Sequence, residues 1–328
     1  MIIVTGGAGF IGSNIVAKLE QHEYKDIVVI DWLGNGDKWK NIAKRELAGI
    51  VPPEQTLTYL HEHKEEIDAI IHMGAISATT ETNADLIIRS NFTLSWDLWC
   101  FCRDNDAQFI YASSAATYGN GDYGFSDNDN ITYLNQLTPL NPYGWSKALF
   151  DRKIAREVLE KRRTPPQYVG LKFFNVYGPN EYHKDGQKSV VAHIFPDVKD
   201  NKEVKLFKSY HPQYKDGEQL RDFVWVEDIA DVVLWFLEHK EISGLFNVGS
   251  GEARSFYDLA KAVFIATNKT PLIGFKEMPE TLREKYQYFT KADLTKLRQI
   301  GYTQPMTPLE EGIRQYVQNY LNTPDIYK

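Results

Sequence analysis

Short apolar runs without polar alternation recur through the first half of the chain. Helical patterns separate these runs, which lie at residues 2–4, 27–30, 69–71, 109–112 and 168–171. The first helical pattern is an apolar stripe formed by Ile11, Ile15, Val16 and Leu19. Strands that are apolar on both sides and alternate with helices are typical of a parallel sheet covered on both faces. The pattern therefore predicts an α/β fold with a doubly wound parallel sheet.

The residue composition and the frequency of apolar runs change after about residue 176. Residues 177–220 are rich in Lys, His, Tyr and Gly, and they contain few apolar runs. A helical pattern returns at 226–238, and a strand-like run follows at 246–248. A chain of 328 residues accommodates about two domains. We predict a sheet domain and a smaller, partly interleaved C-terminal α/β lobe, from residues 1–176 plus 220–248 and from 177–219 plus 249–328 respectively.

A glycine-rich turn joins the first predicted strand to the first predicted helix, with the sequence Thr5-Gly6-Gly7-Ala8-Gly9-Phe10-Ile11-Gly12. Gly6 permits the tight turn, Gly9 lets the backbone approach a pyrophosphate, and Gly12 lets the helix pack closely on the strand. The helix N-terminus then faces the phosphates with unpaired N–H groups and a positive dipole. Asp31 follows Gly12 by 19 residues, at the end of the next strand, where an acidic residue binds ribose. The sheet domain is therefore predicted to be a Rossmann-like dinucleotide-binding domain.

The residues around Asp31 leave the type of nicotinamide dinucleotide open. An acidic residue at this position ordinarily favours NAD over NADP, because it hydrogen-bonds the adenosine ribose. Four cations follow closely, at Lys38, Lys40, Lys44 and Arg45. One of them could hold a 2′-phosphate through a charge-assisted hydrogen bond, or all four could form a solvated basic face.

Tyr143-Gly144-Trp145-Ser146-Lys147 places a phenol and an ammonium four residues apart, on one face of a helix. As a general base near neutrality, a tyrosine must lower its pKa from about 10 by roughly three, a cost of ~4 kcal/mol. A neighbouring ammonium and a positive nicotinamide ring both favour the phenolate. Ser114 ends a predicted strand, where ligands bind in such sheets, and its hydroxyl can contact a substrate alcohol. These residues predict a catalytic site.

Composition excludes several classes of protein. Apolar residues make up 43% and charged residues 25%, as in soluble globular proteins. The net charge is 37 − 44 = −7, so nucleic acid is not an expected partner. Cys100 and Cys102 are predicted to pack in a core, which fits a reducing cytosol. No run approaches the length of a membrane span, and structure is predicted from Ile2, so we expect a cytoplasmic protein without a leader peptide.

No metal site is predicted from the sequence. The acidic stretch at residues 127–130 hints at a calcium loop. Thr132 and Thr138, however, stand where such a loop needs Gly and Glu.

Together, the glycine turn, Ser114 and the Tyr143–Lys147 pair resemble the extended short-chain dehydrogenase/reductase superfamily of nucleotide-sugar enzymes. Residues 221–228 resemble its late signature. Dehydratases of that group carry an Asp-Glu pair where Ala116-Thr117 stand here, which disfavours dehydration. A more specific match is to the ADP-L-glycero-D-manno-heptose 6-epimerase family. The segments that carry this match are residues 1–14, 111–119, 174–179, 181–184, 234–238 and 286–294.

This resemblance implies a reaction and a set of residue roles. The family inverts C6 of an ADP-heptose, a precursor of the lipopolysaccharide inner core, and prefers NADP. By resemblance, Tyr143 and Lys184 are the acid/base residues, Lys147 orients the cofactor, and Ser114 is the hydroxyl partner. The cofactor would be lined by Phe10, Ile11, Asp31, Trp32, Lys38, Met73, Gly74, Ala75, Ile76, Ser77, Asn91 and Val176. The ADP-heptose would be held by Asn175, Gly186, His193, Phe207, Lys208, Ser209, Tyr210, Arg221 and Tyr286.

The chain also departs from the family pattern. Pro53 stands at the family's second cofactor-phosphate lysine, so NADP preference would depend more on Lys38, with Lys40 or Arg45 as further candidates. Gly186 replaces a substrate-contacting serine and offers only its backbone. Residues 209–219 are longer than in the best-known branch, which leaves their contacts open.

Two rival functions and the oligomeric state remain to be distinguished. A UDP- or GDP-hexose 4-epimerase would share everything through Lys147 and differ in the second half. A catalytically silent NADP-sensing protein would need none of Ser114, Tyr143 and Lys147, and all three are present. The resemblance implies a homo-oligomer, for which Trp96, Trp99 and Phe101 offer apolar surface, although core packing explains them equally well.

Overall fold

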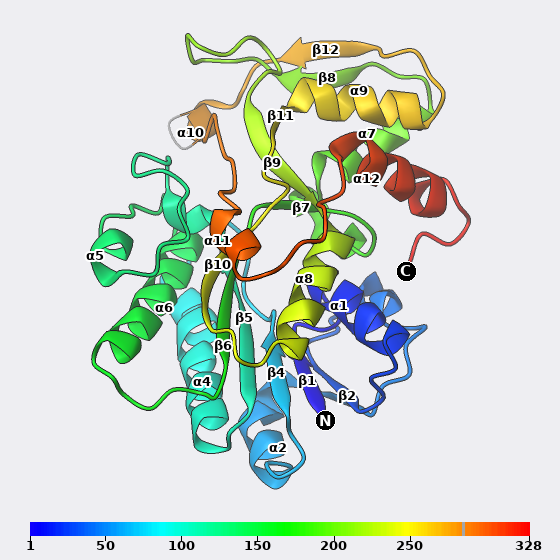
Figure 1. Ribbon diagram of the computed structural model, residues 1–328. Coiled ribbons are helices and arrows are strands. Elements are labelled where there is room, and N and C mark those ends of the chain that lie inside the picture. The colour runs from blue at the N-terminus through cyan, green and yellow to red at the C-terminus, as the bar shows by residue number, and fades with distance from the viewer. Residues whose placement is uncertain (284–285) are drawn as a thin grey trace.

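A seven-stranded sheet forms the centre of the protein. The structure is a computed structural model that describes residues 1–283 and 286–328 (Figure 1). Every pair of neighbouring strands in this sheet is parallel. Across the sheet the strands are β10 (Gly244–Val248), β6 (Tyr168–Phe173), β5 (Gln108–Ser114), β4 (Ala69–His72), β1 (Ile2–Thr5), β2 (Ile27–Ile30) and β3 (Gly49–Val51). The predicted doubly wound, Rossmann-like sheet is confirmed.

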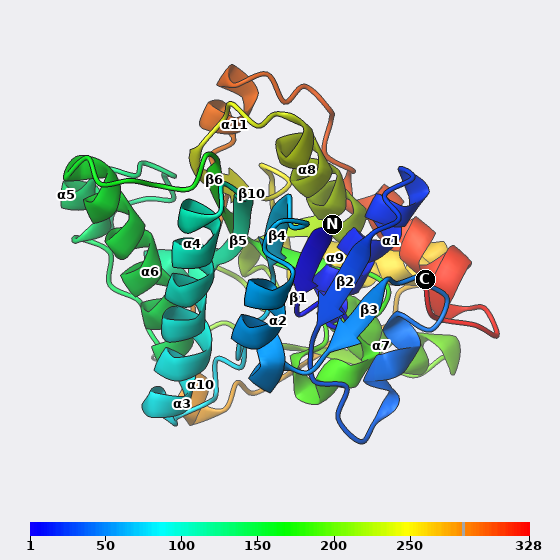
Figure 2. The ribbon, with the colours of Figure 1, turned by 90° about the horizontal axis from the view of Figure 1, so that it is seen from below.

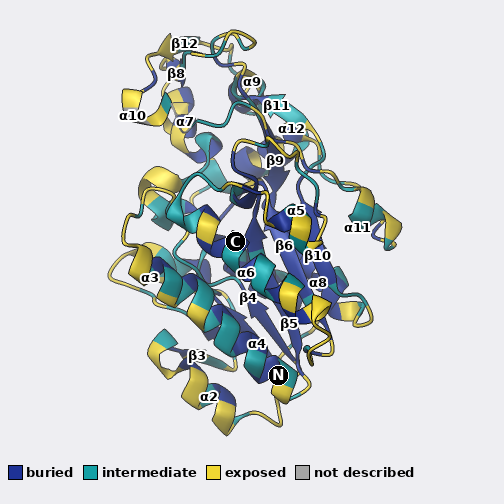
Figure 3. Ribbon diagram, turned by 90° about the vertical axis from the view of Figure 1, so that its left-hand side faces the viewer, coloured by how far each residue is buried: buried dark blue, intermediate teal, exposed yellow. Residues whose placement is uncertain are grey.

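Helices cover both faces of this sheet, as the view from below shows (Figure 2). One face carries α2 (Thr56–Glu62), α4 (Leu94–Asp104) and α6 (Pro142–Leu159), and the other carries α1 (Phe10–Gln21) and α8 (Val226–Glu238). Apart from the edge strand β3, the strands are buried on both sides, which explains their unbroken apolar runs (Figure 3). The short helix α3 (Ala84–Ile88) continues through the π-helical turn η3 (Arg89–Thr93) into α4, and α5 (Ile131–Leu134) belongs to a connecting segment.

Smaller sheets lie beyond the carboxyl ends of the central strands (Figure 1). One consists of β11 (Ala253–Ser255), β9 (Leu220–Trp225) and β7 (Asn175–Tyr177), and the other of β12 (Ile273–Lys276) and β8 (Val204–Phe207). Helices α7 (Val190–Lys199), α9 (Phe256–Ala266) and α12 (Leu309–Tyr316) lie in this region, and α10 (Glu280–Arg283) follows β12 along the chain. Helix α11 (Thr295–Gln299) packs against β10 of the central sheet instead. Helices α7, α9 and α12 share a second apolar core with β7, β8 and β9. The predicted domain boundaries themselves stay a prediction.

The hydrophobic pattern of the sequence did not predict strand β9, and there is a physical reason for this. Strand β9 contains Arg221 and Asp222, which a reading of hydrophobicity takes for a surface segment. Asp222 is fully buried because its carboxylate accepts hydrogen bonds from the backbone N–H groups of Ser250, Gly251 and Ala292. A buried charge supplied with such donors is tolerated in a core.

Most of the apolar side chains considered for an oligomer contact are buried within the fold. Trp99 and Phe101 are buried in the core between α4 and the sheet, so they are not available to a second copy. Trp96 is half-buried, with the Lys153 ammonium 4.1 Å from its ring centroid. Cys102 is buried and Cys100 half-buried, both as free thiols. In the described part of the chain, no helix combines the length and apolar character needed to cross a membrane.

The core between α8 and β10 gives a direct test of the fold. Phe246 on β10 is 1% exposed, and its ring centroid lies 4.9 Å from that of Phe236 on α8. We expect Phe246→Ala to lower the free energy of unfolding by about 3–5 kcal/mol, because it removes a buried ring and leaves a cavity. Urea denaturation measures this loss. Leu159→Ala, at a side chain that is 64% exposed, is the control and should cost below about 1 kcal/mol.

Candidate active site

The glycine turn adopts a backbone shape that side chains would prevent. Gly6 has φ +66°, and the N–H of Gly9 donates to its carbonyl at 2.9 Å. A Cβ on Gly12 would lie 2.1 Å from the Gly6 oxygen, so only glycine allows α1 to start this close to β1. The first turn of α1 therefore directs its backbone N–H groups out of the carboxyl edge of the sheet. This cradle fits a pyrophosphate.

Asp31 follows β2 and contributes to the same cradle. One oxygen of its carboxylate accepts the N–H of Ala8 at 3.0 Å. The other accepts the Lys38 ammonium at 2.6 Å, and Lys38 also donates to the Trp32 carbonyl at 2.8 Å. Asp31, the acidic residue expected to bind the ribose, is therefore paired with the cation of Lys38.

The structure separates Lys38 from the other cations of its stretch. Trp32, which is 52% exposed, donates its indole N–H to Glu54. The remaining three cations are engaged in the ion pairs Lys40–Asp37, Lys44–Asp325 and Arg45–Glu20. Of the four candidates for a 2′-phosphate contact, only Lys38 is bound to Asp31.

The predicted cofactor segment at residues 73–77 lies against the glycine turn. The N–H of Gly74 donates to the Thr5 hydroxyl at 3.2 Å. Asn91 holds the segment through both backbone groups of Ile76, at 2.8 and 3.0 Å. The Asn91 amide also donates to the Ser146 hydroxyl on α6, at 3.1 Å. This asparagine therefore joins the cofactor segment to the helix that carries Tyr143.

A second close approach brings that helix to Ser114. Asn141 caps α6 by accepting the N–H of Gly144 at 2.8 Å. A Cβ on Gly144 would lie 2.7 Å from the carbonyl oxygen of Ala116, in the 3-10 turn η4 (Ala115–Tyr118) that follows β5. Because glycine permits this contact, the side chain of Tyr143 lies beside Ser114, close enough for Ser114 to lower the pKa of the phenol.

Burial dominates the electrostatics of the predicted acid/base pair. It raises the pKa of Tyr143, although the hydrogen bond from Ser114 acts in the opposite direction. It also lowers the pKa of Lys147 to about 8, against the attraction of Asp151. In the chain alone, burial therefore leaves the pKa of Tyr143 above its usual value, and the net depression needed for a general base is absent. The Tyr143 phenol is protonated at neutral pH, while most Lys147 side chains carry a charge.

A buried histidine that the sequence did not single out lies beneath these residues. His72 ends β4, and its ring bonds to Thr5 Oγ1 at 2.6 Å and to Ser95 Oγ at 2.8 Å. Burial, helped by the positive charge of Lys147, lowers the pKa of His72 to about 3. His72 is therefore uncharged, and it lies between Thr5 at the glycine turn and Lys147 on α6.

Lys184 lies on the 3-10 segment η5 (Tyr182–Gln187), next to the glycine turn. Its ammonium is 5.4 Å from the centroid of the Phe10 ring, and burial lowers its pKa. The neighbouring His183 bonds to Asn41, whose amide in turn donates to the Ala8 carbonyl at 2.8 Å. Segment η5 is therefore fastened across the start of α1, an arrangement that the sequence pattern gave no reason to expect.

Arg221 provides a buried cation farther along the same edge. It lies on β9, and the neighbouring strand β7 carries Asn175 and Val176. Its guanidinium is 5.0 Å from the centroid of the Tyr286 ring and 5.8 Å from that of Phe256. The guanidinium is buried, and one of its amino groups donates to the Leu220 carbonyl at 2.8 Å. Its remaining N–H donors could serve a diphosphate.

The remaining predicted substrate residues form two peripheral groups. The His193 ring bonds to the carbonyl of Gly186 at 3.3 Å, on an exposed surface. In the segment Phe207–Tyr210, Lys208 pairs with Glu277 at 2.7 Å, and Ser209 donates its N–H to Asp216 at 2.8 Å. The Tyr210 hydroxyl also donates to Glu277. Within residues 1–283 and 286–328, no hydrogen bond joins either group to Ser114, Tyr143 or Lys147.

The longer segment at residues 209–219 packs through an aromatic cluster. His211 and Tyr214 both contact the ring of Tyr288, with centroids 5.0 and 5.6 Å away. Tyr286 packs edge-on against Tyr288, at 5.3 Å. The cluster thus links this segment to Arg221 through Tyr286. Among the described residues, no group of three or more His, Cys, Asp or Glu side chains could hold a metal ion.

Comparison with known proteins identifies the family. Residues 2–249 match the NAD dependent epimerase/dehydratase family. The chain belongs to this family. Its membership agrees with the glycine turn and with the expected nicotinamide cofactor. The ADP-L-glycero-D-manno-heptose-6-epimerase of Fusobacterium nucleatum subsp. nucleatum is 48% identical over 335 aligned residues, covering 100% of both proteins. The predicted resemblance to nucleotide-sugar epimerases is thereby confirmed.

Solved structures agree with this assignment. The crystal structure of Helicobacter pylori ADP-L-glycero-D-manno-heptose-6-epimerase superimposes with a TM-score of 0.75 at 29% identity, covering 97% of this chain and 95% of that one. A Thermus thermophilus UDP-glucose 4-epimerase, in complex with NAD, superimposes with a TM-score of 0.73 at 25% identity, covering 96% and 97%. The fold is therefore common to both epimerases, and the 48% identity to the Fusobacterium relative is what points to the heptose epimerase.

The burial of Lys147 predicts a conflict between stability and activity. Its pKa of about 8 in the fold lies below the 10.5 of an exposed lysine. Holding its charge in the fold thus costs about 3 kcal/mol below pH 8, and the cost vanishes as pH rises to about 10.5. We expect Lys147→Met to be more stable than the wild type at pH 7 by up to that amount, and to lose its activity.

Urea denaturation at a series of pH values measures this difference. The difference in the free energy of unfolding between Lys147→Met and the wild type should become smaller as pH rises from about 8 to about 10.5. The reason is that the wild-type lysine loses its proton in that interval. Lys153→Met is the control on the same helix, at a side chain that is 29% exposed and paired with Glu157. A Lys147→Met protein no more stable than the wild type at pH 7 would contradict the prediction.

Proposed function

We propose that the protein is an ADP-heptose 6-epimerase. It converts ADP-D-glycero-D-manno-heptose to ADP-L-glycero-D-manno-heptose, a precursor of the lipopolysaccharide inner core, with bound NADP. The observation that carries the proposal is the approach of Tyr143 to Ser114 on the sheet edge that holds the glycine turn. The 48% identity to a full-length relative of that name supports the choice of substrate.

The reaction is a redox-neutral inversion at C6. The substrate alcohol is oxidised to a ketone and reduced again from the opposite face, and the nicotinamide supplies the acceptor and donor of hydride. The chain must remove a proton from the C6 oxygen and return one after the carbon has turned. Tyr143 and Lys184 are proposed for these two proton transfers, because the oxygen must be served in two orientations. Ser114 hydrogen-bonds the oxygen, and Lys147 holds the cofactor ribose.

The distribution of cations suits an ADP-sugar. Arg221 is proposed to bind the diphosphate, with Asn175 on the adjacent strand and Tyr286 against its guanidinium. Burial lowers the pKa of Lys184, which favours a role as an acid/base group over that of a permanent cation. His193 and the carbonyl of Gly186 are proposed to contact the sugar from the exposed side.

The state of Asp31 supports NADP over NAD. A carboxylate at this position repels a 2′-phosphate unless a cation neutralises it. Lys38 lies 2.6 Å from this carboxylate and keeps part of its surface exposed, so it both neutralises Asp31 and offers donors to a phosphate. Pro53, where the family has another lysine, leaves Lys38 as the main contact.

An isotope experiment tests the reaction. We expect ADP-D-glycero-D-manno-heptose labelled with deuterium at C6 to give an L-glycero product that keeps the label in ordinary water, as followed by NMR. Loss of the label to solvent would indicate deprotonation chemistry. Turnover of UDP-glucose or UDP-galactose in place of the ADP-heptose would favour a 4-epimerase. Tyr143→Phe is the control, with kcat lower by about 10²–10⁴-fold and cofactor binding retained.

A second experiment tests the cofactor. We expect Lys38→Met to raise the Kd for NADP by about tenfold or more, because it removes a charge-assisted hydrogen bond to the 2′-phosphate. The Kd for NAD should stay within about twofold. Isothermal titration with each dinucleotide measures both constants. Lys40→Met, whose lysine pairs with Asp37, is the matched control and should change neither. An equal loss of both dinucleotides would argue against a phosphate contact.

A further inference from the structure

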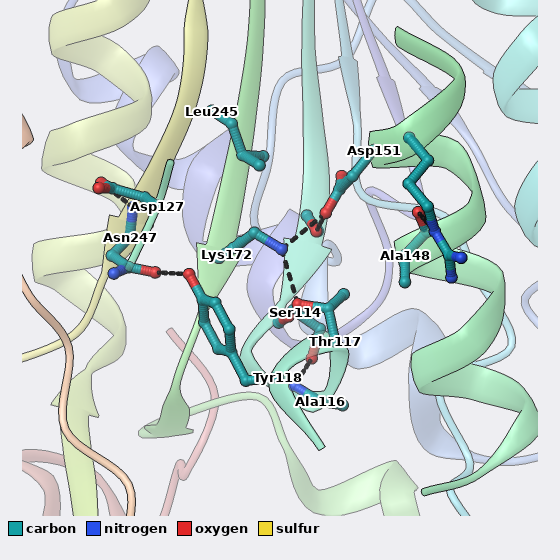
Figure 4. Close-up of polar contacts among 12 residues, drawn as sticks. Ser114, Ala116, Thr117, Tyr118, Asp127, Ala148, Asp151, Lys172, Leu245 and Asn247 are labelled. Atoms are coloured by element: carbon teal, nitrogen blue, oxygen red, sulfur yellow. Dashed lines mark hydrogen bonds and ion pairs between the residues drawn. The ribbon is translucent and has the colours of Figure 1, made fainter. Parts of the chain in front are cut away.

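A lysine is buried in the central sheet, directly beneath the candidate active site. Lys172 lies on β6 with a side chain that is 0% exposed. Its ammonium donates to the carboxylate of Asp151 on α6 at 2.8 Å, and that side chain is 1% exposed. Figure 4 shows the ammonium between the Asp151 carboxylate and the hydroxyl of Thr117.

Hydroxyl groups extend this ion pair to both sides of Ser114. The Asp151 carboxylate also accepts the Ser113 hydroxyl at 2.7 Å and the Tyr111 hydroxyl at 3.2 Å, both from β5. On the other side, Lys172 donates to Thr117 Oγ1 at 2.6 Å. The Thr117 hydroxyl donates in turn to the carbonyl of Ser114 at 2.8 Å. The pair therefore holds the residue before Ser114 and the turn after it.

Asp151 also belongs to the catalytic face of α6. It follows Tyr143 by eight residues and Lys147 by four, and both spacings return to the same side of a helix. The helix that presents the phenol and the ammonium is thus anchored to the sheet by the next side chain on that face.

Stability alone does not account for an ion pair at this position. Removing two charges from water costs several kcal/mol for each ion, and apolar residues of similar volume are often as stable or more so. What the pair adds is direction, because its hydrogen bonds fix the contacts between α6, β5 and β6.

We propose that Asp151 and Lys172 are positioning residues, whose buried ion pair locks α6 against the strand end that carries Ser114. Tyr143 and Lys147 are thereby held in line with Ser114 for the proton transfers. The proposal rests on the proposed function for its activity readout.

The electrostatics agree with this geometry. The Asp151 charge raises the pKa values of both Tyr143 and Lys147. Three further titratable groups face the pair or its neighbours from the surrounding elements. They are Tyr111 on β5, Tyr118 of η4 with its ring centroid 4.8 Å from the Lys172 ammonium, and His72 on β4 near Lys147. Losing the Asp151 charge must therefore lower the pKa of Lys147 below its present value of about 8.

The test compares two carboxylates on one helix. Asp151→Asn removes the charge beneath the site, and Glu157→Gln removes an equally buried charge that pairs with Lys153 and Arg162 instead. The titration of Lys147 is followed by NMR in full-length protein labelled with ¹³C at lysine Cε, with Lys147→Met to assign the signal. Epimerase kinetics with ADP-heptose supply kcat and KM.

We expect Asp151→Asn to shift the Lys147 titration to lower pH and to lower kcat about tenfold or more, with KM within about twofold. Glu157→Gln should leave the titration and kcat unchanged, whatever it does to stability. An unshifted titration in Asp151→Asn, or an equal fall of kcat in both variants, would overturn the proposal. The titration needs no turnover, so a wild type inactive on ADP-heptose would refute the proposed function without deciding this point.

A milder variant covers the case in which Asp151→Asn does not fold. Ser113→Ala removes one hydrogen-bond donor from the Asp151 carboxylate and leaves the ion pair in place. The carboxylate is then less neutralised, so the Lys147 titration should move to higher pH, opposite to the effect of Asp151→Asn. A titration that stays at the wild-type position in Ser113→Ala would contradict the electrostatic coupling on which the proposal depends.

Discussion

The register of the parallel strands is the constraint on which the site depends. Thr5 on β1 pairs with His72 on β4, and His72 pairs with Tyr111 on β5. Strand β5 continues for three more residues beyond that level, to Ser114, which pairs with Phe173 of β6. The serine therefore lies beyond the ends of β1 and β4 and level with the end of β6. The glycine turn, the cofactor segment and the catalytic helix can all meet it there without a long loop.

The sequence predicted the parts of the site that depend on local patterns. The glycine spacing predicted the turn, and the four-residue spacing of Tyr143 and Lys147 predicted their common helix face. The Asp151–Lys172 pair was not predicted, because its partners lie on different elements and a lysine at the end of an apolar run looks like the end of a strand. Likewise, the basic stretch after Asp31 could not be resolved. The partners of Lys44 and Arg45 are Asp325 and Glu20, which are distant in sequence.

Burial also changes the chemistry that a motif suggests. A lysine four residues after a tyrosine is expected to stabilise the phenolate, yet the surroundings withdraw water from both groups at once. Each is then driven towards its neutral form, the phenol by a raised pKa and the ammonium by a lowered one. The fold alone therefore does not activate Tyr143. Activation requires a further positive charge, which an oxidised nicotinamide ring supplies.

The fastening of η5 across the start of α1 bears on how the enzyme would treat its dinucleotide. The Asn41–His183 contact and the position of Lys184 beside Phe10 place η5 next to the phosphate cradle. An oxidase or reductase must exchange its coenzyme at every cycle, and a segment held beside the cradle would slow that exchange. An epimerase recovers its oxidant within each turnover and can keep the same molecule through many cycles. A coenzyme retained beneath η5 in this way would be a resident part of the protein, and the catalyst would be uncoupled from the redox balance of its surroundings.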